Sequence, residues 1–274
     1  MRRARLAAAQ TVPHPGDKPR NLSRIAALTA QAAEQGADLI CFPEMATTGS
    51  THGKADLAEE VPGPTTYFLG DLARRHHLWL VAGMLEAHPD GEHRYNAAVV
   101  FDPQGDLQHI YHKVFLFTGE RATCTPGAGP CLIDFPFGRG GLTICYDYIF
   151  PGYVSGLVDA GAEFILHPTA WLTTPAWESF GYTDELFRAV GITRAVENTV
   201  WFVSANHSGP YDAEGVYTAI GRSAVIAPWG AIAAEVPSGE GLAVADVDFE
   251  AMAAWREQVA PYLVDRRNIT PWNE

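Results

Sequence analysis

The amino-acid sequence predicts an α/β protein in which a mixed sheet, or two stacked sheets, is covered by helices. Two observations lead to this fold class. Short runs that are apolar on both faces alternate with stretches of helical periodicity, as expected for strands buried between layers. The chain also repeats one unit, because "QGADLICFPE" is echoed by "AGAEFILHPTAW" at residues 160–171. Two helix–Gly–strand–Pro units predict two related halves, each a layer of strands backed by helices.

The elements can be assigned in chain order. In "NLSRIAALTAQAAEQGADLICFPE" the apolar residues follow helical spacing, with Asn21 as the expected N-cap and Gly36 as the C-cap glycine. The strand "ADLICF" then ends at Pro43 and Glu44. Further strands are expected at 78–84 and 96–102, in "LQHIYHKV", and at 200–206 after a helix around 185–197. "GRSAVIAPWG" and "GLAVADVDF" resemble a closing hairpin.

Residues 1–274 are expected to form a single domain with a C-terminal tail from about residue 251. Hydrophobic residues make up 47% of the chain, and no Pro/Ser-rich linker or charge block divides it. The tail carries Tyr262, Leu263 and Trp272, which favours docking on a neighbour or partner over a free end.

Composition excludes several classes of function. The net charge of -13 argues against binding to nucleic acid or to an anionic membrane. The N-terminus lacks the apolar core of a signal peptide, and no apolar run reaches the length of a membrane helix, about 18 residues. The four cysteines show no CxxC spacing, so reduced thiols in a cytoplasm are expected. The histidines are scattered, and neither a metal site nor a cofactor is expected.

Four residues carry groups suited to catalysis. Glu44 follows the strand "ADLICF", Lys113 lies in "HIYHKVFLF", Cys145 follows the short apolar run "GLTI", and Glu120 comes seven residues after Lys113. Taken singly, each has an ordinary alternative: a solvated loop carboxylate, a lysine that reaches the surface, a cysteine packed in the core. Together they supply a nucleophile, a base to take its proton, and a cation to hold a thiolate or an oxyanion. Only three of the 19 basic residues are lysines, which makes Lys113 conspicuous.

The order of the motifs resembles the nitrilase superfamily of carbon–nitrogen hydrolases. "LICFPE", "YHKVFLFTGE", "TPG", "GLTICYDYIFP", "ILHPTAW", "RAVENTVWFVSAN" and "GRSAVIAPWG" follow that family's order over roughly residues 5–250. The resemblance implies a four-layer α-β-β-α sandwich of two related halves. It also implies a Glu44–Lys113–Cys145 triad with Glu120 as an auxiliary glutamate, and a homodimer or larger homo-oligomer.

The same resemblance implies hydrolysis of a small amide or N-carbamoyl compound through a cysteine thioester, with ammonia or an amine released. Nitrile-cleaving members tend to have Cys-Trp-Glu at the nucleophile, whereas this chain has Cys145-Tyr146-Asp147, as amidases do. Members similar to omega-amidases typically have arginine where Ile149 stands, which favours a substrate without a carboxylate at this spot.

The backbone N–H of Tyr146 is expected to face the oxyanion. Tyr146, Tyr148 and Trp171 are expected to supply walls of the substrate pocket, although core packing explains such aromatic residues equally well. Three other functions stay open: nitrile hydrolysis by the same triad, acyl transfer to an amine, and ligand binding without catalysis.

Overall fold

Two six-stranded sheets form the centre of the computed structural model, which describes residues 2–49, 55–212 and 215–268. The first sheet contains, in spatial order, β15 (Gly241–Asp248), β1 (Arg3–Gln10), β2 (Leu39–Cys41), β3 (Trp79–Ala87), β4 (Arg94–Phe101) and β5 (Leu107–His112). The second sheet contains, in spatial order, β14 (Ile232–Val236), β13 (Ser223–Ile226), β10 (Trp201–Ala205), β8 (Phe164–Pro168), β7 (Gly138–Leu142) and β6 (Cys131–Phe135).

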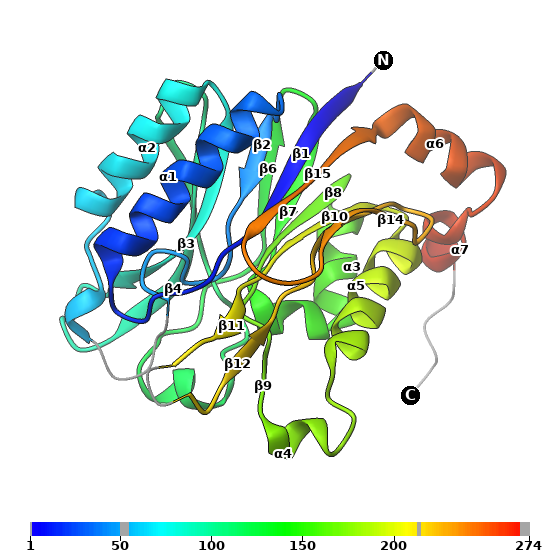
Figure 1. Ribbon diagram of the computed structural model, residues 1–274. Coiled ribbons are helices and arrows are strands. Elements are labelled where there is room, and N and C mark those ends of the chain that lie inside the picture. The colour runs from blue at the N-terminus through cyan, green and yellow to red at the C-terminus, as the bar shows by residue number, and fades with distance from the viewer. Residues whose placement is uncertain (1, 50–54, 213–214, 269–274) are drawn as a thin grey trace.

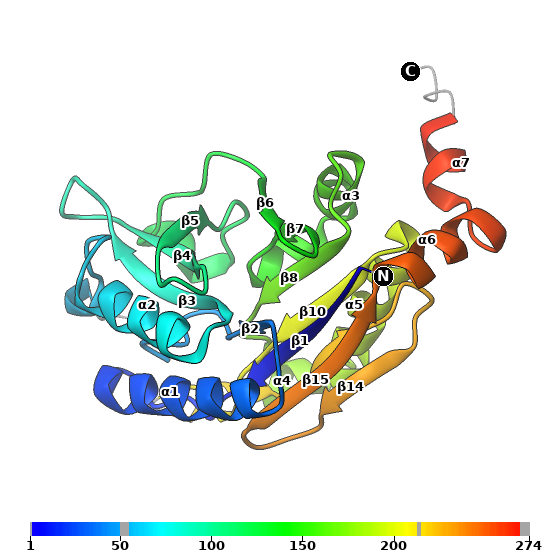
Figure 2. The same ribbon diagram turned by 90° about the horizontal axis from the view of Figure 1, so that it is seen from above.

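Helices cover the outer face of each sheet, as Figures 1 and 2 show. The first sheet is covered by α1 (Lys18–Glu34) and α2 (Pro64–His76), and the second by α3 (Pro151–Asp159) and α5 (Asp184–Asn198). The layers therefore run helix, sheet, sheet, helix, which confirms the predicted four-layer α-β-β-α sandwich. The smaller elements are the three-stranded sheet of β11 (Ser208–Pro210), β12 (Thr218–Ile220) and β9 (Leu172–Thr173), the helix α4 (Pro175–Glu178), and the 3-10 helices η1 (Ala55–Leu57), η2 (Thr118–Ala122) and η3 (Cys145–Ile149).

Alternating side chains along the central strands produce the separate layers. On β2, Leu39 and Cys41 join the core between the two sheets, whereas Ile40 packs against α1 and α2. On β8, Phe164 belongs to the core between the sheets, whereas Ile165 packs against α3 and α5. Successive side chains of a strand point to opposite faces, so a strand buried on both faces must be apolar at every position. This explains the continuous apolar runs in the sequence.

The two sheets repeat one topology. The order β15-β1-β2-β3-β4-β5 corresponds to β6-β7-β8-β10-β13-β14, and every pair of neighbours has the same parallel or antiparallel direction in both sheets. Gly36 (φ 72°) and Gly161 (φ 103°) end the corresponding helices in conformations that favour glycine. The repeat recognised in the sequence is thus a repeat of the fold.

Two sequence-based assignments are wrong in detail. The N-cap of α1 is Asp17, which accepts a hydrogen bond from Arg20 N, because the helix starts one turn earlier than expected with proline in its first turn. Asn21 lies inside α1, where its side chain bonds the His14 backbone. The expected closing hairpin is also absent from the described chain: β14 pairs with β13, whereas β15 crosses to the first sheet and pairs with β1.

The described part of the C-terminal tail docks on its own chain. It forms α6 (Phe249–Gln258) and α7 (Tyr262–Asn268) at the edge of the sandwich (Figure 1). Leu263 packs on the core beneath α3 and α5, and Arg266 donates hydrogen bonds to Ser155 and Asn198 at 3.1 and 2.7 Å. Trp272 lies outside the described residues. None of the described helices is long and apolar enough to cross a membrane.

Candidate active site

The predicted reactive residues come together at one end of the sandwich. Glu44 follows β2 and Lys113 follows β5, both in the first sheet, whereas Cys145 begins η3 just beyond β7 of the second sheet. Glu120 lies in η2. All four line one cavity of about 710 Å³, including its open mouth. The cavity therefore lies where the two halves of the molecule meet.

Glu44 occupies a tight turn that a glycine makes possible. A β-carbon added to Gly83 of β3 would lie 2.4 Å from Pro43 O and 2.7 Å from Glu44 Cα. The backbone carbonyl of Glu44 accepts a hydrogen bond from His207 Nε2 at 2.8 Å, and the next residue, Met45, has a positive φ of 52°. Close packing and hydrogen bonds thus hold the turn in a conformation that non-glycine residues rarely adopt.

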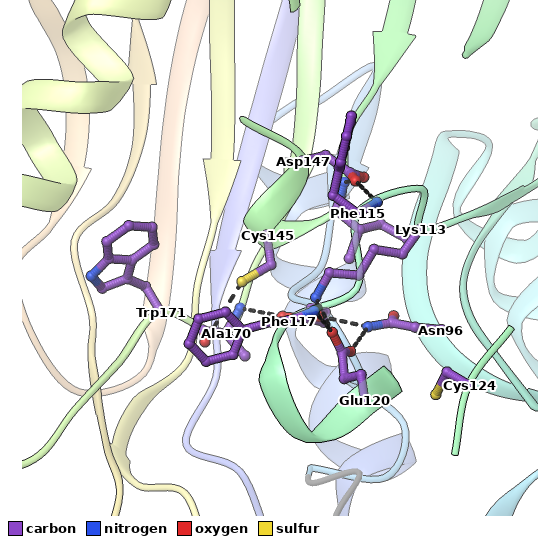
Figure 3. Close-up of polar contacts among 12 residues, drawn as sticks. Asn96, Lys113, Phe115, Phe117, Glu120, Cys124, Cys145, Asp147, Ala170 and Trp171 are labelled. Carbon is purple, nitrogen blue, oxygen red and sulfur yellow. Dashed lines mark hydrogen bonds and ion pairs between the residues drawn. The ribbon is translucent and has the colours of Figure 1, made fainter. Parts of the chain in front are cut away.

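Lys113 is buried between two carboxylates. Its Nζ donates to Glu44 Oε1 at 2.7 Å and to Glu120 Oε2 at 2.8 Å, and Figure 3 shows Lys113 beside Glu120. The Asn96 amide donates to Oε1 of both glutamates at 2.6 Å. Burial alone would lower the pKa of Lys113, but attraction to Glu44 and then to Glu120 outweighs it and raises this pKa well above the ordinary value. The lysine is therefore a permanent cation.

The second half of the molecule donates one further hydrogen bond to the Glu44 carboxylate. The other carboxylate oxygen, Oε2, accepts a hydrogen bond from Ala170 N at 2.9 Å. Ala170 follows β8, the strand of the second sheet that corresponds to β2. Oε1 of Glu44 is thus held by two donors of the first half, and Oε2 by one donor of the second half.

Cys145 lies half-buried at a sharp strand-to-helix turn. Its φ of 45° is unusual for a residue with a side chain and places the sulfur toward Ala170 O, 3.9 Å away (Figure 3). Burial, followed by the charge of Glu44, raises the pKa of the thiol to about 12, although Lys113 acts in the opposite direction. The resting thiol is therefore neutral at pH 7.

Aromatic side chains form the rest of the cavity wall. Tyr146 and Trp171, both predicted as pocket residues, line the cavity. Tyr148 does not: its side chain is fully buried behind the wall, stacked on His167 with 4.4 Å between ring centroids. It packs edge-on against Trp171 at 5.4 Å, so it supports the wall from behind. Tyr146 and Tyr148 are two residues apart on a short helix, and their side chains therefore point to different sides.

Sequence reasoning missed several residues of the site. Asn96 was assigned to a strand without a role; a polar residue in an apolar run was the available signal. The remaining wall residues carried no such signal, because they come from loops and small elements far apart in the chain. They are Phe117, Thr118, Leu172, Trp177, Tyr182, Tyr211 and Tyr217.

Comparison with known proteins agrees with this geometry. The family model described as carbon–nitrogen hydrolase matches residues 5–257. The chain belongs to the carbon–nitrogen hydrolase family. This carbon–nitrogen hydrolase is 33% identical over 264 residues to the omega-amidase NIT2 of Mus musculus, covering 91% of this chain and 90% of that protein. It is 32% identical to the omega-amidase NIT2 of Danio rerio, covering 92% and 90% of the two chains.

Solved structures extend the likeness to the whole fold. A double mutant of the amidase from Nesterenkonia sp. AN1, in complex with acrylamide, superimposes with a TM-score of 0.82 at 28% identity, covering 97% of this chain and 95% of that one. Another mutant of that amidase, in complex with butyramide, gives a TM-score of 0.81 at 29% identity, with 96% and 94% covered. A carbon–nitrogen hydrolase from Helicobacter pylori G27 shares the fold with a TM-score of 0.88 at 24% identity, covering 97% and 96%.

These likenesses fix the class of reaction. The protein is a nitrilase-superfamily hydrolase that acts on carbon–nitrogen bonds other than peptide bonds. The predicted superfamily and enzyme class are confirmed.

Proposed function

We propose that the protein hydrolyses a small, uncharged amide through a thioester on Cys145, with Glu44 as the base and Lys113 as the stabilising cation. The observation that carries this proposal is the cavity between the halves. In it a neutral, half-buried thiol lies in the fields of a fixed carboxylate and a fixed ammonium. A thiol whose pKa is raised to about 12 needs a base for its proton, and Glu44 is the carboxylate whose charge acts most strongly on it.

In the first half of the reaction, Glu44 takes the Cys145 proton while the sulfur attacks the amide carbon. The tetrahedral oxyanion then lies near Lys113 and the N–H of Tyr146. Tyr146 is the second residue of η3, and the first N–H groups of a helix have no acceptor within it. Each such donor contributes about 3–4 kcal/mol in comparable sites. Glu44 returns the proton to the leaving nitrogen, which departs as ammonia or an amine, and the thioester remains.

In the second half, water completes the cycle. Glu44 takes a proton from the water as the water attacks the thioester carbonyl, and the C–S bond breaks as the tetrahedral intermediate collapses. The carboxylic acid leaves, and the proton held by Glu44 returns to the sulfur. Glu120 and Asn96 do not take part in bond making: they hold Lys113 and Glu44 in place. An amine in place of water would make the protein an acyltransferase.

The charges in the cavity favour an uncharged substrate. Among the described residues that line it, two carboxylates, Glu44 and Glu120, face the single cation Lys113. Lys113 is already paired with both, so a carboxylate on the substrate would gain no free cation and would meet a net negative charge. The mouth continues into an apolar groove that includes Ile149, Phe180 and Leu186. An aliphatic or aromatic amide fits these surfaces.

The test is ammonia release from matched amides. The panel holds butyramide, benzamide, the monoamide of glutaric acid, and the uncharged methyl ester of that monoamide. We expect turnover of the uncharged amides and at least a tenfold lower kcat/KM for the monoamide than for its ester. Cys145→Ala should abolish release, lowering it by at least about 10,000-fold. Cys131→Ala removes a thiol outside the cavity and should keep wild-type turnover.

Two results would contradict the proposal. Wild-type turnover in Cys145→Ala would exclude the thioester, and faster hydrolysis of the charged monoamide would exclude the preference for uncharged substrates. An N-carbamoyl compound and a nitrile belong in the same panel. Faster release from either than from every amide would replace the amidase assignment by carbamoylase or nitrilase.

We further propose that residues 1–274 act as a single carbon–nitrogen hydrolase domain in the cytoplasm, assembled as a homodimer or larger homo-oligomer. The free thiols support a reducing compartment. Side chains of the C-terminal segment support assembly, since Val259, Tyr262 and Val264 are exposed. Light scattering that gave the mass of one 29.7 kDa chain at micromolar concentration would contradict the assembly.

A further inference from the structure

Asp147 is a buried carboxylate that does not line the cavity. It lies in η3, two residues after Cys145, and is fully buried. Its Oδ1 accepts a hydrogen bond from Phe115 N at 2.8 Å. Its Oδ2 accepts from Ile144 N at 2.8 Å and from the Tyr111 hydroxyl at 2.7 Å. Three donors therefore converge on one carboxyl group.

These donors belong to two segments from different sheets. Tyr111 lies in β5 and Phe115 comes two residues after Lys113, so both belong to the strand and loop that carry the cation. Ile144 comes directly before the nucleophile Cys145, beyond β7 of the second sheet. Asp147 thus ties the segment of Lys113 to the turn of Cys145, as Figure 3 shows for the Phe115 contact.

The segment of the cation has no regular secondary structure at this point, and the nucleophile is the first residue of a five-residue 3-10 helix. Residues 113–117 run between β5 and η2 outside any helix or strand, and Cys145 has a strained φ of 45°. The distance between the cation and the sulfur therefore depends on contacts across the two halves. Misplacing a reacting group by about 1 Å can reduce a rate by about 100-fold.

We propose that Asp147 is a positioning residue that fixes Lys113 relative to Cys145 across the junction of the two sheets. The inference rests on the proposed function, because it assigns Asp147 to the same reaction. Burial raises the pKa of Asp147 to about 6, although the hydrogen bonds from the N–H groups of Phe115 and Ile144 act to lower it. At neutral pH the group is therefore ionised and purely an acceptor, as its three donors require.

The decisive variant is Asp147→Asn. An amide of the same size offers one oxygen and one NH2 group, so either the Phe115 N–H or the Ile144 N–H loses its acceptor. We expect kcat per active enzyme to fall about 100-fold while KM changes less than about threefold. The matched control is Asp102→Asn, which changes another buried carboxylate that accepts two backbone N–H groups, in the turn between β4 and β5 and outside the cavity. We expect its kcat to stay within about threefold of wild type.

Active enzyme is counted by labelling Cys145 with iodoacetamide, so that loss of folded protein does not count as loss of turnover. If Asp147 only stabilises the fold, Asp147→Asn will yield less protein with wild-type kcat per labelled site, and the proposal is overturned. Asp147→Glu covers the case in which the asparagine variant fails to fold. It keeps both acceptor oxygens but displaces them by one methylene, and we expect a kcat about tenfold lower per site; wild-type kcat in this variant also overturns the proposal.

The labelling rate separates this proposal from the proposed function. Lys113 lowers the pKa of the Cys145 thiol, so a displaced lysine leaves less thiolate and slower labelling. Removal of the negative charge of Asp147 would by itself act in the opposite direction. Severalfold slower labelling in Asp147→Asn therefore supports the positioning role even if no amide is turned over. An unchanged or faster rate overturns it, whatever the substrate.

Discussion

The turn after β2 and the turn after β8 are built alike but contribute differently to the site. Both follow a helix, a glycine of positive φ and a strand, with a proline two residues after the end of β2 and at the last position of β8. After Pro43 the chain presents the carboxylate of Glu44; after Pro168 it presents the backbone N–H of Ala170 and the ring of Trp171. The two turns meet directly, because Ala170 N donates to Glu44 Oε2. The repeated scaffold thus supplies the Glu44 carboxylate in the first half and the Ala170 N–H that donates to it in the second half.

The same division holds for the whole cavity. The first half contributes the buried charges, Glu44, Lys113 and Glu120, and the second contributes the thiol of Cys145 and much of the aromatic wall. Charges cluster in one half because each of them needs the others: a lone carboxylate or ammonium at such depth would neutralise itself or unfold the site. The nucleophile has no such requirement, since it rests as a neutral thiol. The division predicts different consequences for mutations in the two halves.

The largest effect is expected from Glu44→Gln, which removes the proposed base and keeps the shape of the side chain. Turnover should fall by about 10,000-fold, at the upper end of what one general base contributes. Labelling of Cys145 by iodoacetamide at pH 9 should instead become faster, because the charge of Glu44 raises the pKa of the thiol and the glutamine has none. Slower labelling at pH 9 would show that Glu44 does not control this pKa.

Lys113→Met should have the next largest effect. It leaves Glu44 and Glu120 buried without their cation, and we expect kcat to fall by about 100- to 1,000-fold with a loss of about 3–5 kcal/mol in unfolding free energy. The loss follows because both carboxylates lose the ammonium that donates to them at 2.7 and 2.8 Å. Denaturant unfolding of the variant beside wild type measures it.

The control for that experiment is Lys18→Met. Lys18 pairs with Glu59 in a partly buried site away from the cavity, and the variant should keep wild-type kcat. A Lys113→Met enzyme as stable and as active as Lys18→Met would contradict the dependence of the first half on its cation.

The smallest effect on kcat is expected from substitutions at corresponding positions of the two repeated sheets. Gly83 on β3 and Ala205 on β10 occupy corresponding positions, two residues beyond Val81 and Val203. Gly83→Ala would push a β-carbon against backbone atoms of the Glu44 turn, and we expect kcat to fall about 100-fold. Ala205→Gly should cost only about 0.5–1 kcal/mol of stability and leave kcat unchanged. Equal effects on kcat would show that the Glu44 turn does not need the glycine.

Much of the fold could be read from the sequence. The alternating helices and doubly apolar strands and the repeated Gly-Ala-acid unit follow from local chemistry, because helix caps and strand periodicity depend on near neighbours. The pairing of β15 with β1 could not be predicted from the sequence, because the residues of one strand do not show which sheet edge is free to pair with it. The N-cap of α1 was misplaced by one turn because Asp17 and Asn21 are both suitable caps.

The candidate site also has parts that the sequence predicted and parts that it did not. The sequence alone singled out Glu44, Lys113, Glu120 and Cys145 as a set, because their motifs occur together in one family's order, although each residue taken singly has an ordinary alternative. Only the tertiary structure decided that Asn96 donates to both glutamates, that Asp147 accepts three hydrogen bonds outside the cavity, and that Tyr146 and Trp171 line the cavity while Tyr148 lies behind it. A hydrogen bond between residues dozens of positions apart, or the side of a wall that a ring faces, is set by the packing of two sheets against each other, and no local pattern records it.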